Sequence, residues 1–328
     1  MNLFISQSHN NFETFYEDSL RWTLEFKKLC NTKFSGKIDL VDVGTVQVGK
    51  VKLNGKIEQS GLTPKGYRTL VIPSNNSQPF NWLNKDVNSN DLLIFSTQGD
   101  LKAISFDAFH NYIISIEENL FDEIMNQYKL INLGRKLDSS EKVIQSNRGF
   151  LIYIQTYLEM VFDQLRREPE LIHSTSFLYS IQQGLPAKIL SFLDGKELLV
   201  TDSRSRKRDI AIEKCKNYVA EHTLNDISLT RLTEISDVSE RTIELAFLER
   251  YGLTPVAYIN AIKFNEARNT ILTPSNKELI SDVAKRIGFN HMGQFSAGYK
   301  KLFGELPSET TLRLRNQKNR EPDLMELS

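Results

Sequence analysis

The amino-acid sequence predicts an α+β protein, with a β-sandwich or cupin-like barrel and its flanking helices in front of an all-helical C-terminal domain. Three observations lead to this prediction. From about residue 34 to 116, apolar and polar side chains alternate with a period of two, which is typical of short antiparallel strands. From residue 117 to 193 the period becomes helical. Beyond residue 208, a pair of short helices occurs twice, and such a repeat is rarely accidental.

Length and composition are those of a globular protein with two domains. The chain has 328 residues, of which 40% are hydrophobic and 25% charged, an ordinary balance for soluble proteins. Its first ten residues do not combine a basic segment with a long apolar one, and no stretch approaches the roughly 18 apolar residues of a membrane helix. We therefore expect a cytoplasmic protein that makes no contact with a membrane.

The residues that usually carry enzyme or metal chemistry are sparse. Cys30 and Cys215 lie far apart and form no CxxC motif, so each is expected to pack as a small apolar residue. His9, His110 and His173 are scattered, without metal-binding spacing, and the sequence has no glycine-rich phosphate loop and no nucleophile elbow. We expect no catalysis, no metal and no cofactor.

The first part of the N-terminal half contains a predicted helix and the strand region. Residues 12–30 are rich in aromatic side chains with a roughly helical period, and we expect them to pack beside the strands that follow. Gly, Asn, Asp and Pro separate the apolar runs of the strand region. The Asn-Gly pair within Leu53–Lys56 predicts a β-hairpin.

Helical stretches are predicted after the strands, at residues 117–127, 139–168 and 172–193, the last interrupted at residues 184–186. The longest carries an apolar stripe with alternating spacings of three and four, and Pro169 ends it. The stripe consists of Leu151, Ile154, Leu158, Val161 and Leu165. It either covers the β-domain of its own chain or, in part, meets a second subunit.

A domain boundary is predicted near residue 203. Residues 194–209 are rich in Ser, Asp, Gly and basic side chains and have little to bury. We assign residues 1–200 to the N-terminal domain, 201–208 to a linker and 209–316 to the helical domain. The net charge of the whole chain is zero, but the helical domain is basic, which is compatible with a nucleic-acid partner.

The helical domain repeats one unit, at about residues 229–250 and 279–303. In each copy a short apolar helix leads through a tight turn into a second helix, such as residues 239–251. The landmarks Ile243, Phe247, Gly252 and Pro255 of the first copy recur in the same order as Phe295, Tyr299, Gly304 and Pro307. This is the spacing of a helix-turn-helix unit, whose second helix is suited to insertion into a groove.

A long helix is predicted between the two units, over residues 254–272, with Pro255 in its first turn and Pro274 just beyond its end. At about 1.5 Å per residue it measures roughly 28 Å. Successive major-groove faces of DNA lie roughly 34 Å apart. One chain is therefore long enough to reach two adjacent turns of DNA.

The two units and the helix between them resemble the C-terminal module of AraC/XylS-type transcription regulators. The resemblance covers about residues 208–315 and rests on SERTIELAFLERYGLTPVAYINAIKFNEAR and ISDVAKRIGFNHMGQFSAGYKKLFGELPSETTLRLR. It implies a sequence-specific DNA-binding regulator, with a ligand-sensing and dimerising domain in front. Residues 34–120 are in addition weakly similar to the regulator of the ethanolamine operon.

The resemblance also implies DNA contacts for particular residues. Base contacts are expected from Arg241, Thr242, Glu244 and Leu245 in the first unit and from His291 and Gln294 in the second. Backbone contacts are expected from Lys263, Lys285 and Lys300, with Arg286 and Lys301 as further candidates. Arginine reads guanine through two hydrogen bonds, glutamate accepts from cytosine, and leucine meets a thymine methyl group. The alternative for Arg241 and Glu244 is an ion pair within their own helix.

The second unit departs from the family pattern in its second helix. Gly293, Ala297 and Gly298 stand where related proteins often have long polar side chains. We therefore expect the first unit to read bases and the second unit chiefly to hold the DNA backbone.

Aromatic residues of the strand region are candidates for a ligand pocket, namely Phe80, Trp82, Phe95 and Phe106. The alternative for each is ordinary core packing. The expected partners are double-stranded DNA, a small-molecule effector, a second copy of the chain and, for an activator, RNA polymerase. A regulator without a small ligand, controlled by a partner protein or by its abundance, is the alternative function.

Overall fold

The computed structural model describes residues 2–17, 21–82, 85–131, 133, 142–195, 199–200, 207–222, 227–273, 275 and 278–318. The chain forms two compact units, one of Met1–Phe26 with Phe34–Ser203, the other of Lys27–Lys33 with Arg204–Ser328. We call them the N-terminal unit and the helical unit. Residues 27–33 belong to the helical unit, although the predicted boundaries assign them to the N-terminal domain. Most of the predicted linker lies outside the described residues.

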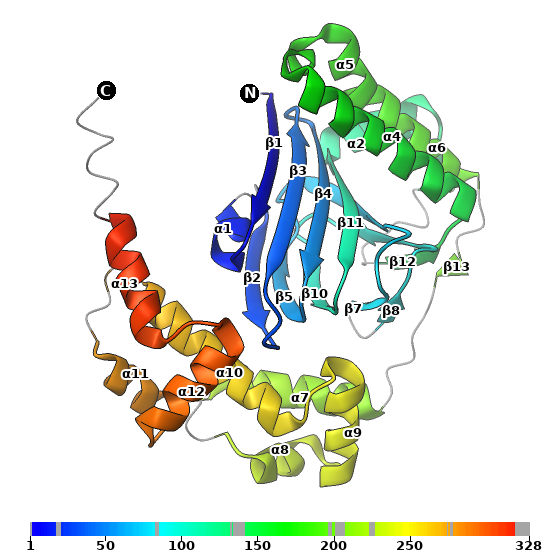
Figure 1. The fold of residues 1–328 in the computed structure, drawn as a ribbon. Coiled ribbons are helices and arrows are strands. Elements are labelled where there is room, and N and C mark those ends of the chain that lie inside the picture. Colours follow the sequence, from blue (N-terminus) through cyan, green and yellow to red (C-terminus); the bar gives the residue numbers. More distant parts are fainter. Residues whose placement is uncertain are drawn as a thin grey trace. The chain divides into compact units, whose positions relative to one another are not determined.

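The N-terminal unit contains two antiparallel sheets (Figure 1). The larger sheet has the strand order β1-β3-β4-β11-β6-β9-β12-β13, and the smaller has β2-β5-β10-β7-β8. The strands are β1 (Leu3–His9), β2 (Thr23–Lys28), β3 (Ser35–Asp42), β4 (Val46–Asn54), β5 (Ile57–Leu62), β6 (Tyr67–Pro73), β7 (Phe80–Trp82), β8 (Lys85–Val87), β9 (Asp91–Phe95), β10 (Asp100–Ser105), β11 (Phe109–Glu117), β12 (Lys142–Gln145) and β13 (Leu199–Val200). The prediction of antiparallel strands between residues 34 and 116 is confirmed.

Helices complete both units. Those of the N-terminal unit are α1 (Phe12–Glu17), α2 (Glu118–Gln127), α4 (Arg148–Arg167), α5 (Thr175–Tyr179) and α6 (Leu185–Asp194), with a 3-10 helix at Pro169–His173. Those of the helical unit are α7 (Lys207–Glu221), α8 (Leu229–Ser236), α9 (Glu240–Tyr251), α10 (Pro255–Leu272), α11 (Ile280–Arg286), α12 (Met292–Phe303) and α13 (Pro307–Lys318). Within the described part of the chain, no helix is long and apolar enough to cross a membrane.

The central strands of the larger sheet are buried on both faces. Along β11, Tyr112, Ile114 and Ile116 belong to a core that the sheet shares with α2, α4 and α6. Phe109 and Ile113, which alternate with them, pack in a second core between the two sheets. The unit therefore has three layers, with the larger sheet between the smaller sheet and the helices. Because both faces are covered, β11 carries apolar residues at most of its positions.

Helix α4 places its predicted apolar stripe against the larger sheet. All five residues of the stripe are at most 4% exposed, and all belong to the core of their own chain. This supports the interpretation that the stripe covers its own β-domain. The predicted start of the helix at residue 139 is wrong, because residues 142–145 form β12 and Asn147 caps α4 by accepting a hydrogen bond from the Phe150 amide at 3.1 Å.

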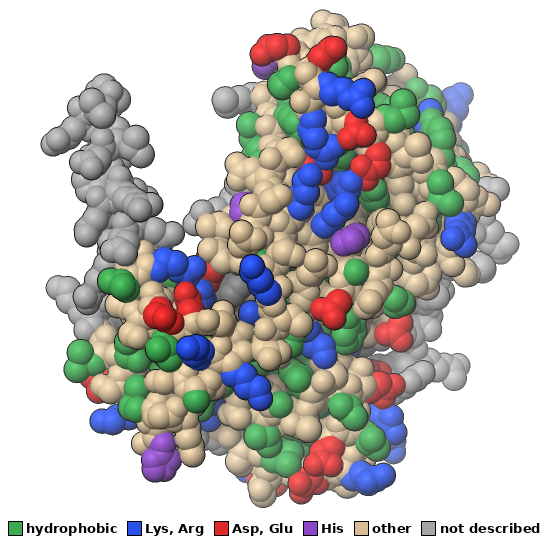
Figure 2. Space-filling view, in the orientation of Figure 1, with side chains coloured by type: hydrophobic (Ala, Val, Ile, Leu, Met, Phe, Trp, Pro, Cys, Tyr) green, Lys and Arg blue, Asp and Glu red, His purple; other side chains and the backbone are tan. Residues whose placement is uncertain are grey.

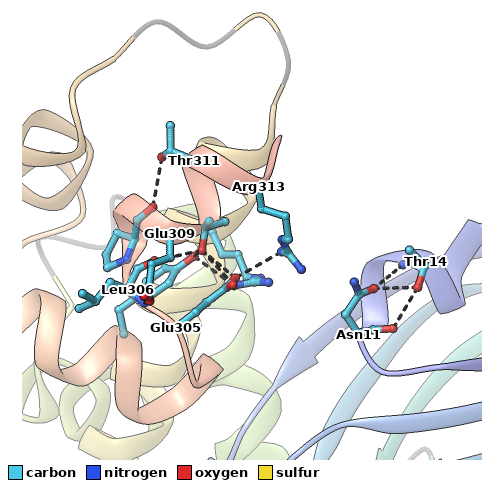
Figure 3. Close-up of polar contacts among 11 residues, drawn as sticks. Asn11, Thr14, Glu305, Leu306, Glu309, Thr311 and Arg313 are labelled. Carbon is cyan, nitrogen blue, oxygen red and sulfur yellow. Dashed lines mark hydrogen bonds and ion pairs between the residues drawn. The ribbon is translucent and has the colours of Figure 1, made fainter. Parts of the chain in front are cut away.

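The prediction of one helix over residues 12–30 is also wrong. Helix α1 ends at Glu17, and β2 follows in the smaller sheet. The Asn11 side chain fixes the start of α1, since its Oδ1 accepts from the Thr14 amide at 2.9 Å (Figure 3). Arg21, with a φ of 67°, lies in the left-handed region between helix and strand. Phe26 then packs between the sheets, and this tertiary contact outweighs the local helical period.

The Asn-Gly pair forms a turn but not the predicted hairpin. Gly55, with a φ of 108°, joins β4 of the larger sheet to β5 of the smaller sheet. β4 is already paired with β3 and β11, so it has no free edge for β5. The chain therefore crosses from one sheet to the other at this glycine.

The interruption predicted at residues 184–186 is a π-helical turn, Ser180–Gly184, between α5 and α6. Pro186 stands in the first turn of α6, where a missing amide hydrogen is tolerated. The apolar stretch thus continues as helix through the predicted break.

Candidate nucleic-acid interface

Local signals set both ends of the helix pair α8/α9. The Ser228 side chain accepts a hydrogen bond from the Arg231 amide at 3.2 Å, and α8 ends at Asp237, which has a left-handed φ of 57°. The Ser239 side chain accepts from the Thr242 amide at 3.3 Å, and α9 ends at Gly252 in the same left-handed region. These serine caps and left-handed ends confirm the helices predicted here.

Helix α9 has a buried face and an exposed face. The buried face holds Ile243, Ala246, Phe247, Arg250 and Tyr251. The exposed face includes Arg241, Glu244, Leu245 and Leu248. Leu248 was not among the predicted contact residues. Its spacing of three from Leu245 and seven from Arg241 is the sequence signal that places it on the same face.

The predicted contact residues of α9 differ in their surroundings. No ion pair between Arg241 and Glu244 is recorded within the described chain, whereas Arg231 and Glu234, at the same spacing, pair at 2.6 Å. The geometry thus gives no support to an ion pair as the role of Arg241. The Thr242 hydroxyl lies 2.9 Å from the Ser239 hydroxyl, so Thr242 takes part in the helix cap.

The second pair, α11/α12, repeats this arrangement with different exposed residues. Gly288, with a φ of 93°, lies in the turn, and α12 begins after His291. Helix α12 buries Phe295, Tyr299 and Leu302. It exposes Gly293, Gln294, Ala297, Lys300 and Lys301, and His291 is exposed at its start. In the register of the repeat, Gly293 and Ala297 correspond to Arg241 and Leu245, so α12 has shorter side chains where α9 has long ones.

Helix α10 holds the two pairs together over its 18 residues (Figure 1). Near its start, the ring of Tyr258 lies 4.3 Å from that of Tyr251 at the end of α9. Further along, the ring of Phe264 stacks on Phe289 at 4.9 Å, in the turn before α12. Aromatic packing near the start and in the middle of α10 therefore joins this one helix to both helix pairs.

Comparison with known proteins identifies the helical region. Residues 232–313 match the helix-turn-helix domain family. The chain is 33% identical over 112 residues to the XylDLEGF operon transcriptional activator of Pseudomonas putida, covering 34% of this chain and 35% of that protein. It is 35% identical over 99 residues to the XylDLEGF operon transcriptional activator 2 of the same organism, covering 30% and 63% of the two chains. This region is an AraC/XylS-type helix-turn-helix domain.

A solved structure is similar to about a third of the chain. It is a probable AraC family transcriptional regulator from Rhodopseudomonas palustris CGA009, 28% identical, with a TM-score of 0.30, covering 32% of this chain and 96% of that one. The chain spans only about a third of the length of the first curated relatives it matches.

A buried polar cluster joins α10, α12 and α13 of the AraC/XylS-type domain. The Arg268 guanidinium donates to Glu305 at 2.8 Å and to the Tyr299 hydroxyl at 3.2 Å. The Tyr299 and Thr310 hydroxyls lie 2.9 Å apart. Burial works to raise the pKa of Glu305, but hydrogen bonds from Thr310 and Arg268 and the charge of Arg268 hold it below its ordinary value. Arg313, labelled in Figure 3, pairs with Glu305 at 3.3 Å.

The lysines expected to contact the DNA backbone are not equivalent. Lys285 and Lys300 are exposed, as are Arg286 and Lys301. Lys263 is only 9% exposed, and burial lowers its pKa, so we remove it from the set of backbone contacts. The sequence alone predicts that the side chain at this position of α10 is exposed to solvent, because charged residues usually are. Figure 2 shows basic side chains interspersed with acidic and apolar ones on the visible face of this domain, without one continuous basic patch.

Substitution by alanine is expected to have opposite effects on stability at two glycines of α12. A Cβ on Gly298 would lie 2.3 Å from Cζ of Phe264, whereas a Cβ on Gly293 would meet nothing within 4 Å. We expect Gly298→Ala to destabilise the domain by about 1–3 kcal/mol through overpacking. Gly293→Ala should be neutral or stabilise it by up to about 1 kcal/mol through helix propensity. Urea unfolding of both variants tests this, and equal stabilities would contradict the close packing of α12 on Phe264.

A cavity of about 70 Å³ lies inside the N-terminal unit, between its two sheets. Three of the four predicted pocket residues, Phe80, Trp82 and Phe95, line it. Phe106 does not, and this part of the prediction is wrong. Its ring is instead covered by the Lys56 ammonium, 5.3 Å from the ring centre. Phe106 follows the last residue of β10, so its side chain is not held in the register of the sheet.

Proposed function

We propose that this chain is a sequence-specific DNA-binding transcription regulator in which α8/α9 and α11/α12 act as two helix-turn-helix units. The observation that carries the proposal is the matched burial of α9 and α12. Each helix packs an apolar face inward and leaves the opposite face exposed. The names of the relatives, which are transcriptional activators, support the same function. The two exposed helices would enter successive major grooves.

Within this proposal, α9 reads the bases. Arg241 is suited to a guanine, Glu244 to a cytosine amino group, and Leu245 with Leu248 to thymine methyl groups. The small residues Gly293 and Ala297 let α12 approach the DNA closely. His291, Gln294, Lys285 and Lys300 then contact chiefly phosphates, which fix position without specifying sequence.

Arg241→Ala tests the base-reading role. After selection of a binding site from random DNA, we expect the variant to lose about 1–3 kcal/mol of affinity for that site and little affinity for random DNA. Lys300→Ala is the matched control, because loss of a phosphate contact weakens binding to both DNAs alike and reduces the salt dependence. Fluorescence anisotropy at several salt concentrations measures both. If Arg241→Ala lost equal affinity for both DNAs, Arg241 would contact only phosphate and would not read a base.

We further propose that residues 1–200 regulate residues 209–316, the DNA-binding domain. The cavity between the sheets supports a small-molecule effector, which controls binding by favouring a dimer. A dimer raises the effective concentration of the second domain at a paired site. Ile152, Tyr153 and Met160 are exposed apolar residues of α4 and offer a surface for the second copy.

The regulator would act in the cytoplasm, where bacterial DNA lies, and as an activator would contact RNA polymerase. It needs no catalytic step and no cofactor. The alternative, a regulator controlled by a partner protein or by its abundance, predicts that no small molecule binds the N-terminal unit. Thermal stabilisation of the full-length chain by a panel of small molecules separates the two.

A further inference from the structure

The cavity in the N-terminal unit is lined by buried polar groups that lack partners. Nδ2 and Oδ1 of Asn111, Nε2 of Gln59 and Nε1 of Trp82 make no hydrogen bond within the described part of the chain. All three residues line the cavity and are at most 5% exposed. Buried polar groups without partners cost free energy. An occupant that forms hydrogen bonds would remove this cost.

The strand register brings two of these groups into one row. Ala103 of β10 is paired with Gln59 of β5 on one side and with Trp82 of β7 on the other. Directly paired residues project from the same face of a sheet. The side chain of Ala103 ends at Cβ. Space therefore remains between the larger side chains of Gln59 and Trp82. Asn111 belongs to β11 of the larger sheet, so polar groups reach the cavity from both sheets.

The rest of the lining excludes charged ligands. Among the described residues that line the cavity there is no Asp, Glu, Lys, Arg or His, and most of them are apolar. Burying a carboxylate or an ammonium group without an opposite charge is strongly unfavourable. The cavity of about 70 Å³ is small, roughly half the volume of an engineered cavity that accepts benzene.

We propose that this cavity binds a small uncharged alcohol with an apolar body. The hydroxyl oxygen accepts a hydrogen bond from Trp82, Gln59 or the amide nitrogen of Asn111. The hydroxyl hydrogen is donated to Oδ1 of Asn111, the acceptor among the unpaired groups. The inference rests on the proposed function, because it names the chemical class of the effector that acts through the N-terminal unit.

Intrinsic fluorescence of the full-length protein tests the proposal directly. The chain has two tryptophans, Trp22 and Trp82, and both line the cavity. The probes are two pairs with shared skeletons and at most three carbon atoms, ethanol with acetate and 1-propanol with propionate. We expect the alcohols to change the fluorescence saturably and to raise the Tm, and each carboxylate to bind at least about tenfold more weakly because of the charge penalty. Equal or tighter binding of the carboxylates, or no saturable binding by any probe, would overturn the proposal.

Variants test the role of the polar groups. Asn111→Leu removes the acceptor at similar volume and should weaken binding of 1-propanol about tenfold, the size of one lost hydrogen bond. Binding of xenon, an apolar probe without a hydroxyl group, should not be weakened. Ala103→Leu should abolish binding of both by filling the space. Phe106→Leu lies outside the cavity and is the matched control with unchanged affinity. Thermal unfolding checks that each variant is folded. Wild-type affinity of folded Asn111→Leu for 1-propanol would contradict the proposed hydroxyl contact.

A separate DNA-binding assay distinguishes this proposal from the proposed function. Alcohol binding that leaves DNA affinity unchanged would uphold the cavity assignment and contradict control by a ligand. A chain that binds the alcohols but no DNA would uphold the cavity assignment and contradict the regulator function.

Discussion

Leu158→Glu is expected to unfold the N-terminal unit. Leu158 is fully buried in the core that α4 shares with the larger sheet. A carboxylate at this position would lie among apolar side chains such as Ile154 and Phe162. Burial of a charge belongs to the few mechanisms that cost more than about 4 kcal/mol. Because a domain has only about 5–15 kcal/mol of stability in total, circular dichroism in urea should show a large loss of folded protein.

Met160→Glu is the matched control on the same helix. Met160 is 57% exposed, so its substitution should change stability by no more than about 0.5 kcal/mol. Met160→Glu also tests the proposed dimer. Leu158→Glu cannot test it, because Leu158 is covered by its own chain. Light scattering should show a smaller dimer fraction for Met160→Glu. An unchanged dimer fraction would remove this face of α4 from the proposed subunit contact.

Arg268→Ala is expected to destabilise the AraC/XylS-type domain by about 3–5 kcal/mol, the usual effect of removing one partner of a buried ion pair. Arg268 is 4% exposed and its guanidinium lies 2.8 Å from Glu305 and 4.5 Å from the Phe303 ring centre. Its removal leaves Glu305 without its closest cation and opens the contact of α10 with α12. Thermal unfolding measures the loss, and DNA affinity should fall with it.

Arg313→Ala is the control for this prediction. Arg313 pairs with the same Glu305 oxygen at 3.3 Å, but its side chain is 32% exposed. Exposed ion pairs contribute at most about 1 kcal/mol. Equal losses for the two variants would show that the cluster contributes through its net charge rather than through burial of Arg268.

Much of the helical unit was predictable because its signals are local. Ser228 and Ser239 cap their helices with their own side chains, and Gly252 and Gly304 end helices in the left-handed conformation that glycine adopts easily. The repeat then located α9 and α12. It also supplied the spacing that predicts which side of each helix is exposed, although Leu248 was overlooked.

The sequence by itself thus determined the region of strands between residues 34 and 116, the duplicated helix pair and the apolar stripe of α4. Tertiary structure alone decided that β2 is a strand, that Gly55 crosses between sheets and that Lys263 is buried. It also decided that Gly298 is small to admit Phe264, which lies far away in the sequence. The physical reason is the same in each case. Caps and periodicity depend on neighbours within a few residues, whereas strand pairing, burial and close packing depend on which distant surfaces cover a residue.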